Sequence, residues 1–174
     1  MPTYVCLLRA VNVGGTGKLP MADLRALCEA AGFTHVRTYI ASGNVVLHGA
    51  ATARQVQATL EGALARYAGK PVGVLIRTPT EMAGVLAANP FTGVAPNRTV
   101  AIFLDQAPPP DALQSVSGQA GEQLALGTRE IYVYYGNGMA ESKLKITAAK
   151  AGTARNINTI AKLVDMAAEQ RPRE

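Results

Sequence analysis

Between residues 36 and 48 the sequence reads Val36-Arg37-Thr38-Tyr39-Ile40-Ala41-Ser42-Gly43-Asn44-Val45-Val46-Leu47-His48. Two runs rich in β-forming residues, 36–41 and 44–48, flank Ser42-Gly43, and this pattern predicts a β-hairpin. Upstream, residues 3–11 have the composition of a central strand that is apolar on both faces. We expect a helix between this strand and the hairpin, because Pro20 suits a first helical turn and Gly32 suits a helix end.

The chain after the hairpin continues with a helix and another strand. Thr52 and Gln55 form a capping box, in which each side chain satisfies an unpaired N–H group at the helix start. We expect this helix to end at Gly69 with Tyr67 facing inward, and residues 71–77 to form a fourth strand. The resulting order, βαββαβ, is typical of a ferredoxin-like α/β plait.

The fold class expected for the whole chain is α+β, with two ferredoxin-like subdomains. The first covers residues 1–78. The second covers residues 79–174, begins with a capping box at Thr78, and has the expected order αβαββαα, which is a permuted or irregular version of the first. Two C-terminal helices are expected at 140–151 and 154–169.

Composition excludes several classes of protein. The 174-residue chain is 48% hydrophobic and 17% charged, as expected for a globular fold, and its net charge is +5. Its first residues show neither a signal peptide nor a membrane span, so we expect a cytoplasmic location and no membrane partner. We expect the two cysteines to be buried, reduced thiols. We expect no cofactor or metal, since His35 and His48 stand isolated and no ligand pattern or hydrolytic triad occurs.

The glycine-rich loop after the first strand is the main candidate for ligand binding. It reads Asn12-Val13-Gly14-Gly15-Thr16-Gly17-Lys18-Leu19, and its N–H groups can turn toward a phosphate. A P-loop is excluded, because Leu19 stands where that motif needs a hydroxyl for Mg²⁺. Two interpretations remain, a small-anion site and a tight connection that uses glycine for positive φ. Arg9, inside the apolar strand, is expected to reach solvent, to pair with a carboxylate or to face a ligand.

A second candidate stretch lies near the C-terminus. Arg155 falls in the first turn of the helix expected to be capped by Thr153, although the helix dipole favours acids there. We do not add the hairpin to the site, because we expect it at the opposite end of the sheet from the glycine-rich loop. The residues predicted to bind the anion are Arg9, Asn12, Gly14, Gly15, Lys18, Lys143, Arg155 and Asn156.

Several stretches, taken in order, resemble a known family. They are residues 4–15, Met21 with Leu24, and residues 32–33, 38–46, 141–144 and 153–163. Together they are similar to the bacterial domain-of-unknown-function family 1697. This resemblance implies two α/β-plait subdomains, and it implies no established activity, cofactor or catalytic residue.

Three hypotheses for the function follow from the sequence. The first is a binding module or enzyme that acts on a small anionic ligand, phosphorylated ligands included. The second is a nucleic-acid-binding plait, although RNA-recognition motifs stack bases on aromatic residues of central strands and residues 45–48 have none. The third is a structural or interaction protein with no small-molecule ligand. An acylphosphatase-like hydrolase matches only thinly, because the glycine-rich loop lacks an arginine. Whether the protein is an enzyme, and its oligomeric state, stay open.

Overall fold

The computed structural model describes residues 2–9, 19–41, 43–136 and 142–169. The chain divides into unit 1, which is Met1–Met82 with Lys162–Glu174, and unit 2, which is Ala83–Ala161. Two helices, α3 (Pro79–Ala87) and α4 (Ile157–Glu169), contain residues of both units. No helix in the described part of the chain is both long and apolar enough to cross a lipid bilayer.

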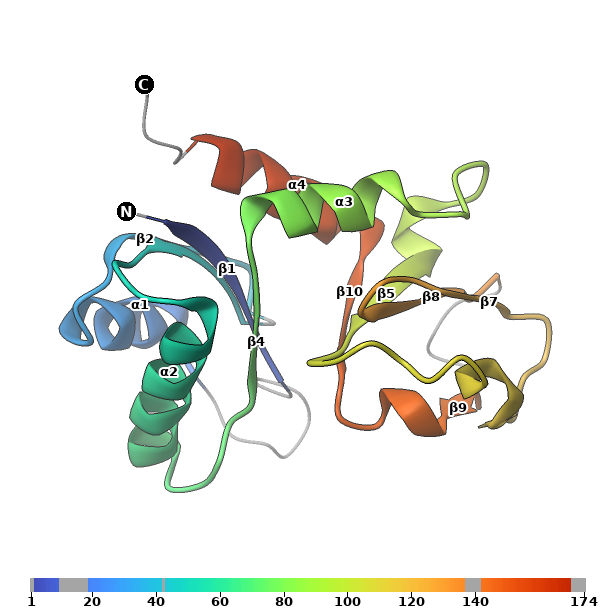
Figure 1. Cartoon of the computed structure of the whole chain (residues 1–174), viewed down its shortest axis with the longest axis horizontal. Helices are drawn as coiled ribbons and strands as arrows, with labels where there is room; N and C mark the ends of the chain where they lie inside the picture. Colours follow the sequence, from blue (N-terminus) through green and yellow to red (C-terminus); the bar gives the residue numbers. More distant parts are fainter. Residues whose placement is uncertain (1, 10–18, 42, 137–141, 170–174) are drawn as a thin grey trace. The chain divides into compact units, whose positions relative to one another are not determined.

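Unit 1 contains strands and helices in the order that the sequence predicts. They are β1 (Thr3–Leu8), α1 (Met21–Ala30), β2 (Thr34–Tyr39), β3 (Asn44–His48), α2 (Ala53–Ala68) and β4 (Val74–Arg77). The sheet has the strand order β2-β3-β1-β4, and all neighbouring strands are antiparallel. β1 is therefore a central strand, and the predicted hairpin is confirmed as β2 and β3 (Figure 1).

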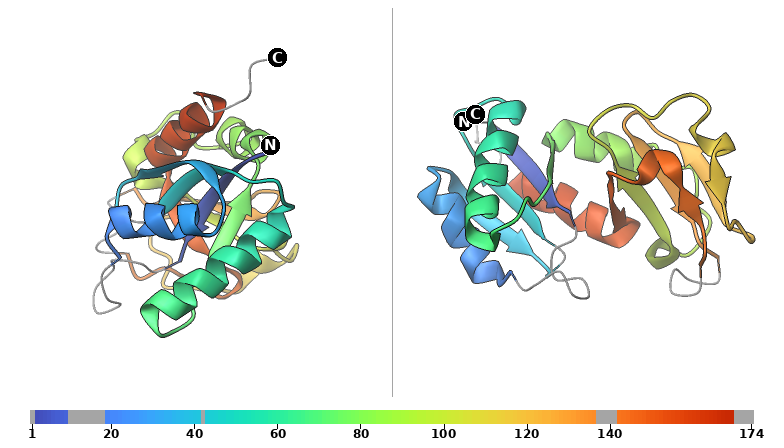
Figure 2. Two further views of the ribbon diagram at one scale, coloured as in Figure 1. Left: turned by 90° about the vertical axis from the view of Figure 1, so that its left-hand side faces the viewer. Right: turned by 90° about the horizontal axis from the view of Figure 1, so that it is seen from below.

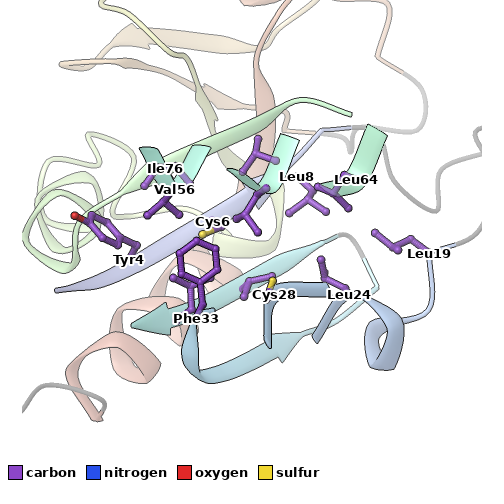
Figure 3. Close-up of a cluster of buried hydrophobic side chains, with 14 residues drawn as sticks. Tyr4, Cys6, Leu8, Leu19, Leu24, Cys28, Phe33, Val56, Leu64 and Ile76 are labelled. Atoms are coloured by element: carbon purple, nitrogen blue, oxygen red, sulfur yellow. The ribbon is translucent and has the colours of Figure 1, made fainter. Parts of the chain in front are cut away.

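The core of unit 1 lies between the sheet and the helices α1 and α2, which cover the same face (Figure 2). Tyr4, Cys6 and Leu8 alternate along β1 and are buried on this face (Figure 3). Cys6 and Cys28 are free thiols, as expected, and burial raises the pKa of both, that of Cys28 to about 12. The helices add Leu24 and Cys28 from α1, and Val56, Leu60 and Leu64 from α2.

Capping boxes begin two helices, as predicted. At α2, the Gln55 N–H donates to Thr52 Oγ1 at 3.2 Å and the Thr52 N–H donates to Gln55 Oε1 at 2.9 Å. At α3, the Glu81 N–H donates to Thr78 Oγ1 at 3.1 Å and the Thr78 N–H donates to Glu81 Oε1 at 2.9 Å. α2 ends at Gly69, whose φ of +71° is readily adopted by glycine. These contacts satisfy backbone groups that helix ends leave unpaired.

Unit 2 forms a second antiparallel sheet with the strand order β10-β5-β8-β7. The two consecutive strands in the order expected for the second subdomain are β7 and β8, which pair as an antiparallel hairpin. Two further short strands, β6 and β9, pair with each other outside this sheet. The strands are β5 (Thr99–Phe103), β6 (Val116–Ser117), β7 (Gln123–Leu126), β8 (Glu130–Tyr134), β9 (Lys145–Ile146) and β10 (Thr153–Asn156), with 3₁₀ turns at Pro96–Arg98, Ala112–Gln114 and Thr147–Ala149.

One face of this second sheet carries its own apolar core. Val100, Ile102 and Leu104 from the β5 segment pack with Ile131 and Val133 from β8. Partly buried residues of the segment around β9 cover them, where the first sheet has helices. These covering residues are Leu144, Ile146, Ala148 and Ala149.

The two predicted C-terminal helices are wrong in part, because the structure has one helix there. The described residues of 140–151 form β9 and a 3₁₀ turn, and the helix predicted from 154 begins at Ile157. Residues 153–156 instead pair with β5, with Arg155 opposite Ala101. The cap is Asn156 rather than Thr153, since Asn156 Oδ1 accepts the Thr159 N–H at 2.9 Å.

Gly152 stands at a close approach between the start of β10 and the end of β5. A Cβ at this position would lie 2.6 Å from the Phe103 carbonyl oxygen, a backbone atom held in the β5 ladder. We predict that Gly152→Ala lowers the free energy of unfolding by about 1–3 kcal/mol, measured by urea denaturation. The control Gly84→Ala, in α3 with no atom within 4 Å, should raise it by about 0.5–1 kcal/mol. Unchanged stability of Gly152→Ala would contradict the close approach.

Candidate functional site

Two connections of unit 1 meet where β1 ends, and a third begins there. The Leu8 N–H donates to the Gly43 carbonyl at 2.9 Å, which brings the β2–β3 hairpin to this point. The Arg9 N–H donates to the Gly73 carbonyl at 2.9 Å, which brings the α2–β4 connection there as well. The third connection is the one that leads from β1 to α1. We call this end of the sheet, with Arg9, residues 40, 41 and 43 and residues 69–73, the loop end (Figure 1).

The loop end corrects one expectation from the sequence. The hairpin and the β1–α1 connection lie at the same end of the sheet, not at opposite ends. The reason is strand direction: β3 and β4 both run antiparallel to β1, so each begins where β1 finishes. The length of the sheet therefore does not separate the hairpin from Arg9.

Arg9 lies just beyond β1, which ends at Leu8, rather than inside the strand. Its side chain is partly buried and passes over Gly73, where a Cβ would come within 3.0 Å of Arg9 Cδ. Glycine at position 73 thus leaves space for the aliphatic part of the arginine. Of the alternatives open for Arg9, the structure places it at a strand end, beside the connections of the loop end.

Ile40 begins the hairpin turn and is strained. Its φ is +50°, and the left-handed region is a genuine outlier for a β-branched residue, with a cost of about 1–3 kcal/mol. Its side chain is 48% exposed, so burial does not offset this cost. The turn is supported by Asn44, which is fully buried and whose Nδ2 donates to the Tyr39 carbonyl at 2.9 Å. The sequence pattern predicted the turn and gave no sign of this strain.

The two helices of unit 1 also reach the loop end. α2 finishes shortly before Gly73, and the Tyr67 hydroxyl, in its last turn, donates to Asp23 Oδ2 in the first turn of α1 at 2.6 Å. The expectation that Tyr67 faces inward is wrong: the side chain is 45% exposed. The hydrogen bond to the Asp23 carboxylate raises the pKa of Tyr67 from its usual value. Asp23 and Tyr67 thus tie the start of α1 to the end of α2.

Half of the predicted site residues lie outside the described part of the chain. Asn12, Gly14, Gly15 and Lys18 belong to residues 10–18, which connect β1 to α1. Their assignment as ligand-binding residues stays a prediction. Within the described residues, Arg9 belongs to unit 1, whereas Lys143, Arg155 and Asn156 belong to unit 2.

Arg155 and Asn156 take part in contacts around the junction of β10 and α4. An Nη of Arg155 donates to Thr153 Oγ1 at 2.6 Å and to the Ala154 carbonyl at 3.0 Å. The side chain is buried, and burial lowers the pKa of Arg155 to about 10. Asn156 is the helix cap, and Lys143 is exposed. These contacts hold the strand-to-helix junction in place.

Nothing in the sequence pointed to one buried carboxylate in unit 2, that of Glu122. Glu122 is 5% exposed, and its carboxylate accepts the Ala120 N–H at 2.5 Å and the Ser142 hydroxyl at 2.6 Å. Ser142 Oγ in turn accepts the Leu144 N–H at 3.2 Å. The Ser142 hydroxyl, followed by the Ala120 N–H, lowers the pKa of Glu122. A carboxylate held in its charged form is a poor general base, so this arrangement joins two loops rather than activating the serine.

The structure also bears on the nucleic-acid hypothesis. An RNA-recognition motif presents exposed aromatic side chains on the sheet face opposite its helices. In unit 1 the corresponding residues of the central strands, Val5, Leu7 and Val46, are aliphatic and 0% exposed. These three positions therefore have no exposed aromatic ring on which a base could stack.

The comparisons with known proteins concern the family and the fold. A family model described as "Protein of unknown function (DUF1697)" matches residues 1–132. The chain belongs to this family. It is the same family that the sequence stretches resemble. Two of those stretches, 141–144 and 153–163, lie beyond the matched residues. No curated protein matches the chain.

A solved structure extends the comparison to nearly the whole chain. It is a conserved bacterial protein, SP0830 from Streptococcus pneumoniae, with a TM-score of 0.78 and 24% sequence identity. The match covers 95% of this chain and 98% of that one. At this identity the likeness concerns the fold, which is a mixed α/β fold with antiparallel sheets.

The hydrogen bond from Tyr67 to Asp23 is expected to control the titration of the phenol. We predict that Asp23→Asn lowers the pKa of Tyr67, because the protonated phenol loses a charged acceptor. The shift is measured by following the Tyr67 ring carbon in NMR spectra as the pH is raised. Asp165→Asn, which changes an exposed acid in α4, should leave the Tyr67 titration unchanged. The same pKa in both variants would show that the contact does not persist in solution.

The hydrogen bond from Ser142 to Glu122 makes a prediction about acid stability. The pKa of Glu122 is lower in the folded state, so its stabilisation is present above the unfolded pKa and lost as the pH falls through the folded value. Ser142→Ala should therefore lower the melting temperature more at about pH 7 than at about pH 3. The control Ser117→Ala removes an exposed hydroxyl from β6 and should change neither value. A Ser142→Ala loss that is independent of pH would contradict this assignment.

Proposed function

We propose that this protein binds a small anionic ligand, phosphorylated ligands included, at the loop end of the first sheet. The observation that carries the proposal is the meeting of the β2–β3 hairpin and the α2–β4 connection beside Arg9, through the bonds from Leu8 to Gly43 and from Arg9 to Gly73. Loops that converge at one end of the strands of a rigid sheet are a common location for ligand binding. The proposal concerns binding, and it assigns no reaction.

Charged side chains of both signs lie at this end. Arg9 supplies a guanidinium group, which pairs well with phosphate and carboxylate oxygens. Lys70, in the α2–β4 connection, is exposed at the same end. The carboxylate of Asp23 opposes an anion, and its hydrogen bond from Tyr67 partly offsets that effect. The Glu61 carboxylate, which accepts the Val74 N–H, also lies near this end, so the two cations balance two carboxylates. The preference for an anion therefore depends on the β1–α1 connection.

The β1–α1 connection completes the proposed site. Its sequence holds Asn12, Gly14, Gly15 and Lys18 between Arg9 and the start of α1. Glycine N–H groups in such a connection can donate to phosphate oxygens, and Lys18 would add a third positive charge. Arg155 and Asn156 are not part of this proposal, because their hydrogen bonds support the junction of β10 and α4. Lys143 is also left out.

We further infer that both units are ferredoxin-like plaits. In unit 1 the four strands, numbered by their order in the chain, have the spatial order 2-3-1-4. The strands β5, β7, β8 and β10 of unit 2 have the same spatial order and the same antiparallel directions. What differs is the crossovers, which are helices in unit 1 and 3₁₀ turns with the β6–β9 ladder in unit 2. On this view the second plait is irregular rather than permuted.

The test is isothermal titration calorimetry of the full chain with inorganic phosphate, pyrophosphate, AMP and glucose 6-phosphate. We predict that at least one of these compounds binds. Arg9→Gln should lower the affinity for it by roughly tenfold to a hundredfold, as expected when a charge-assisted hydrogen bond is removed. Lys18→Gln should also lower the affinity for the same ligand. The control Arg54→Gln removes a positive charge from the first turn of α2, the end of that helix away from the loop end, and should have little effect.

Two results would contradict the proposal. One is the absence of heat and of any thermal stabilisation with all four compounds. The other is binding that Arg9→Gln and Arg54→Gln weaken equally, which would indicate attraction to net charge rather than a defined site.

A further inference from the structure

The two histidines of the chain, isolated in the sequence, lie together in the structure. Their ring centroids are 4.6 Å apart, and the ring planes are tilted by 31°. His35 belongs to β2 and is exposed, while His48 ends β3 and is 7% exposed. His48 pairs with Thr3, where β1 begins. The pair therefore lies at the opposite end of the sheet from the loop end and is independent of the proposed anion site.

A local irregularity in β2 brings the two rings together. The pairing of β2 with β3 shifts register between Thr34 and Arg37, and His35, inside this shift, has a φ of +52°. A β-bulge of this kind redirects a side chain, and bulges are frequent next to functional sites. The structure thus uses a sparsely populated backbone conformation to place an exposed imidazole against a nearly buried one.

A buried hydroxyl stands beside the imidazoles. Thr3 is directly opposite His48 in the β1–β3 ladder, so the two side chains share one face of the sheet. Thr3 is 6% exposed, and its Oγ1 has no hydrogen-bond partner among the described residues. Buried hydroxyls are ordinarily hydrogen-bonded, so an unsatisfied one indicates that a polar species belongs at this position.

We propose that His35 and His48 bind a divalent late transition metal ion, of which Zn²⁺ is the reference case, with Thr3 hydrogen-bonded to a metal-bound water. Zn–N distances of about 2.0–2.1 Å and coordination angles between a right angle and the tetrahedral value place the centroids of two bound imidazoles roughly 4.5–5.2 Å apart. The observed separation of 4.6 Å falls inside this range. In the proposed site, the His35 ring turns so that one of its nitrogens faces the metal bound by His48.

The ligand set defines the class of metal. Imidazole nitrogen favours Zn²⁺, Cu²⁺ and Ni²⁺ over Mg²⁺ and Ca²⁺, which prefer oxygen. In the described part of the chain, no group of three or more His, Cys, Asp or Glu side chains could hold a metal. Water therefore fills the remaining positions, and Thr3 supplies the outer hydrogen bond that holds one of those waters. Such a site is open on one side, at the exposed His35.

The experiment uses the full chain without an affinity tag, since added histidines would compete. Zn²⁺ alone is titrated by calorimetry into wild type, His35→Asn and His48→Gln. Asparagine is chosen at position 35 because it tolerates positive φ, so the fold is retained while the imidazole is lost. We expect one Zn²⁺ per chain in the wild type and at least a tenfold loss of affinity in each variant. Circular dichroism and melting temperature confirm that each variant is folded.

A spectroscopic readout separates coordination by the pair from other metal binding. With one equivalent of Cu²⁺, the electron paramagnetic resonance spectrum of the wild type should show superhyperfine coupling to two imidazole nitrogens, and His35→Asn should show one. Thr3→Val keeps both imidazoles and should weaken Zn²⁺ binding by a smaller factor. Absence of Zn²⁺ binding to the wild type, or binding that survives replacement of both histidines, would overturn the proposal.

Discussion

β1 has an antiparallel partner on each side, and this arrangement fixes the position of every candidate residue in unit 1. Its register with β3 runs from Thr3–His48 to Leu7–Asn44, and β4 pairs with its second half. Because both partners run against β1, both begin where it ends. The hairpin and the α2–β4 connection lie at the end of β1 because of these strand directions, and not because of their own sequences. Thr3–His48, the first pair of the same ladder, places the two histidines at the end of the sheet opposite the loop end.

At Val74, the first residue of β4, side chains of α2 bond to the outer edge of the strand, which fixes the loop end further. Gln57 Nε2 donates to the Val74 carbonyl at 2.7 Å, and the Val74 N–H donates to Glu61 Oε2 at 3.2 Å. An edge residue whose N–H and C=O are both bonded offers no template for another strand. The contact also anchors the residue next to Gly73. The glycine over which Arg9 passes is thus held by the helix as well as by the sheet.

Features that depend on a few neighbouring residues could be predicted from the sequence. The capping boxes at Thr52 and Thr78 involve residues three apart, and the β2–β3 hairpin needs only its own alternation and turn. Features that depend on a distant partner could not. Residues 153–156 form a strand because β5 pairs with them, and they otherwise resemble the start of the helix that follows. Likewise, nothing local shows that a bulge in β2 turns His35 onto a residue of β3.

The second sheet repeats the geometry of the loop end with different chemistry. As Leu8 bonds to the hairpin residue Gly43, so the Leu104 N–H donates to the hairpin residue Arg129 at 2.9 Å, and Gly152 approaches the end of β5 as Gly73 approaches Arg9. The residue after Leu104 is Asp105, however, and Pro108-Pro109-Pro110 follows soon after. An acid repels an anion, and proline has no N–H to donate to one. Arg129 and Gly152 also lie at the end of the second sheet, so the two sheets differ in the connection that follows the first strand. After β1 this connection has Arg9, three glycines and Lys18, whereas after β5 it has Asp105 and three prolines. The strand order supplies a place for a ligand, and the residues after the first strand determine whether an anion can use it.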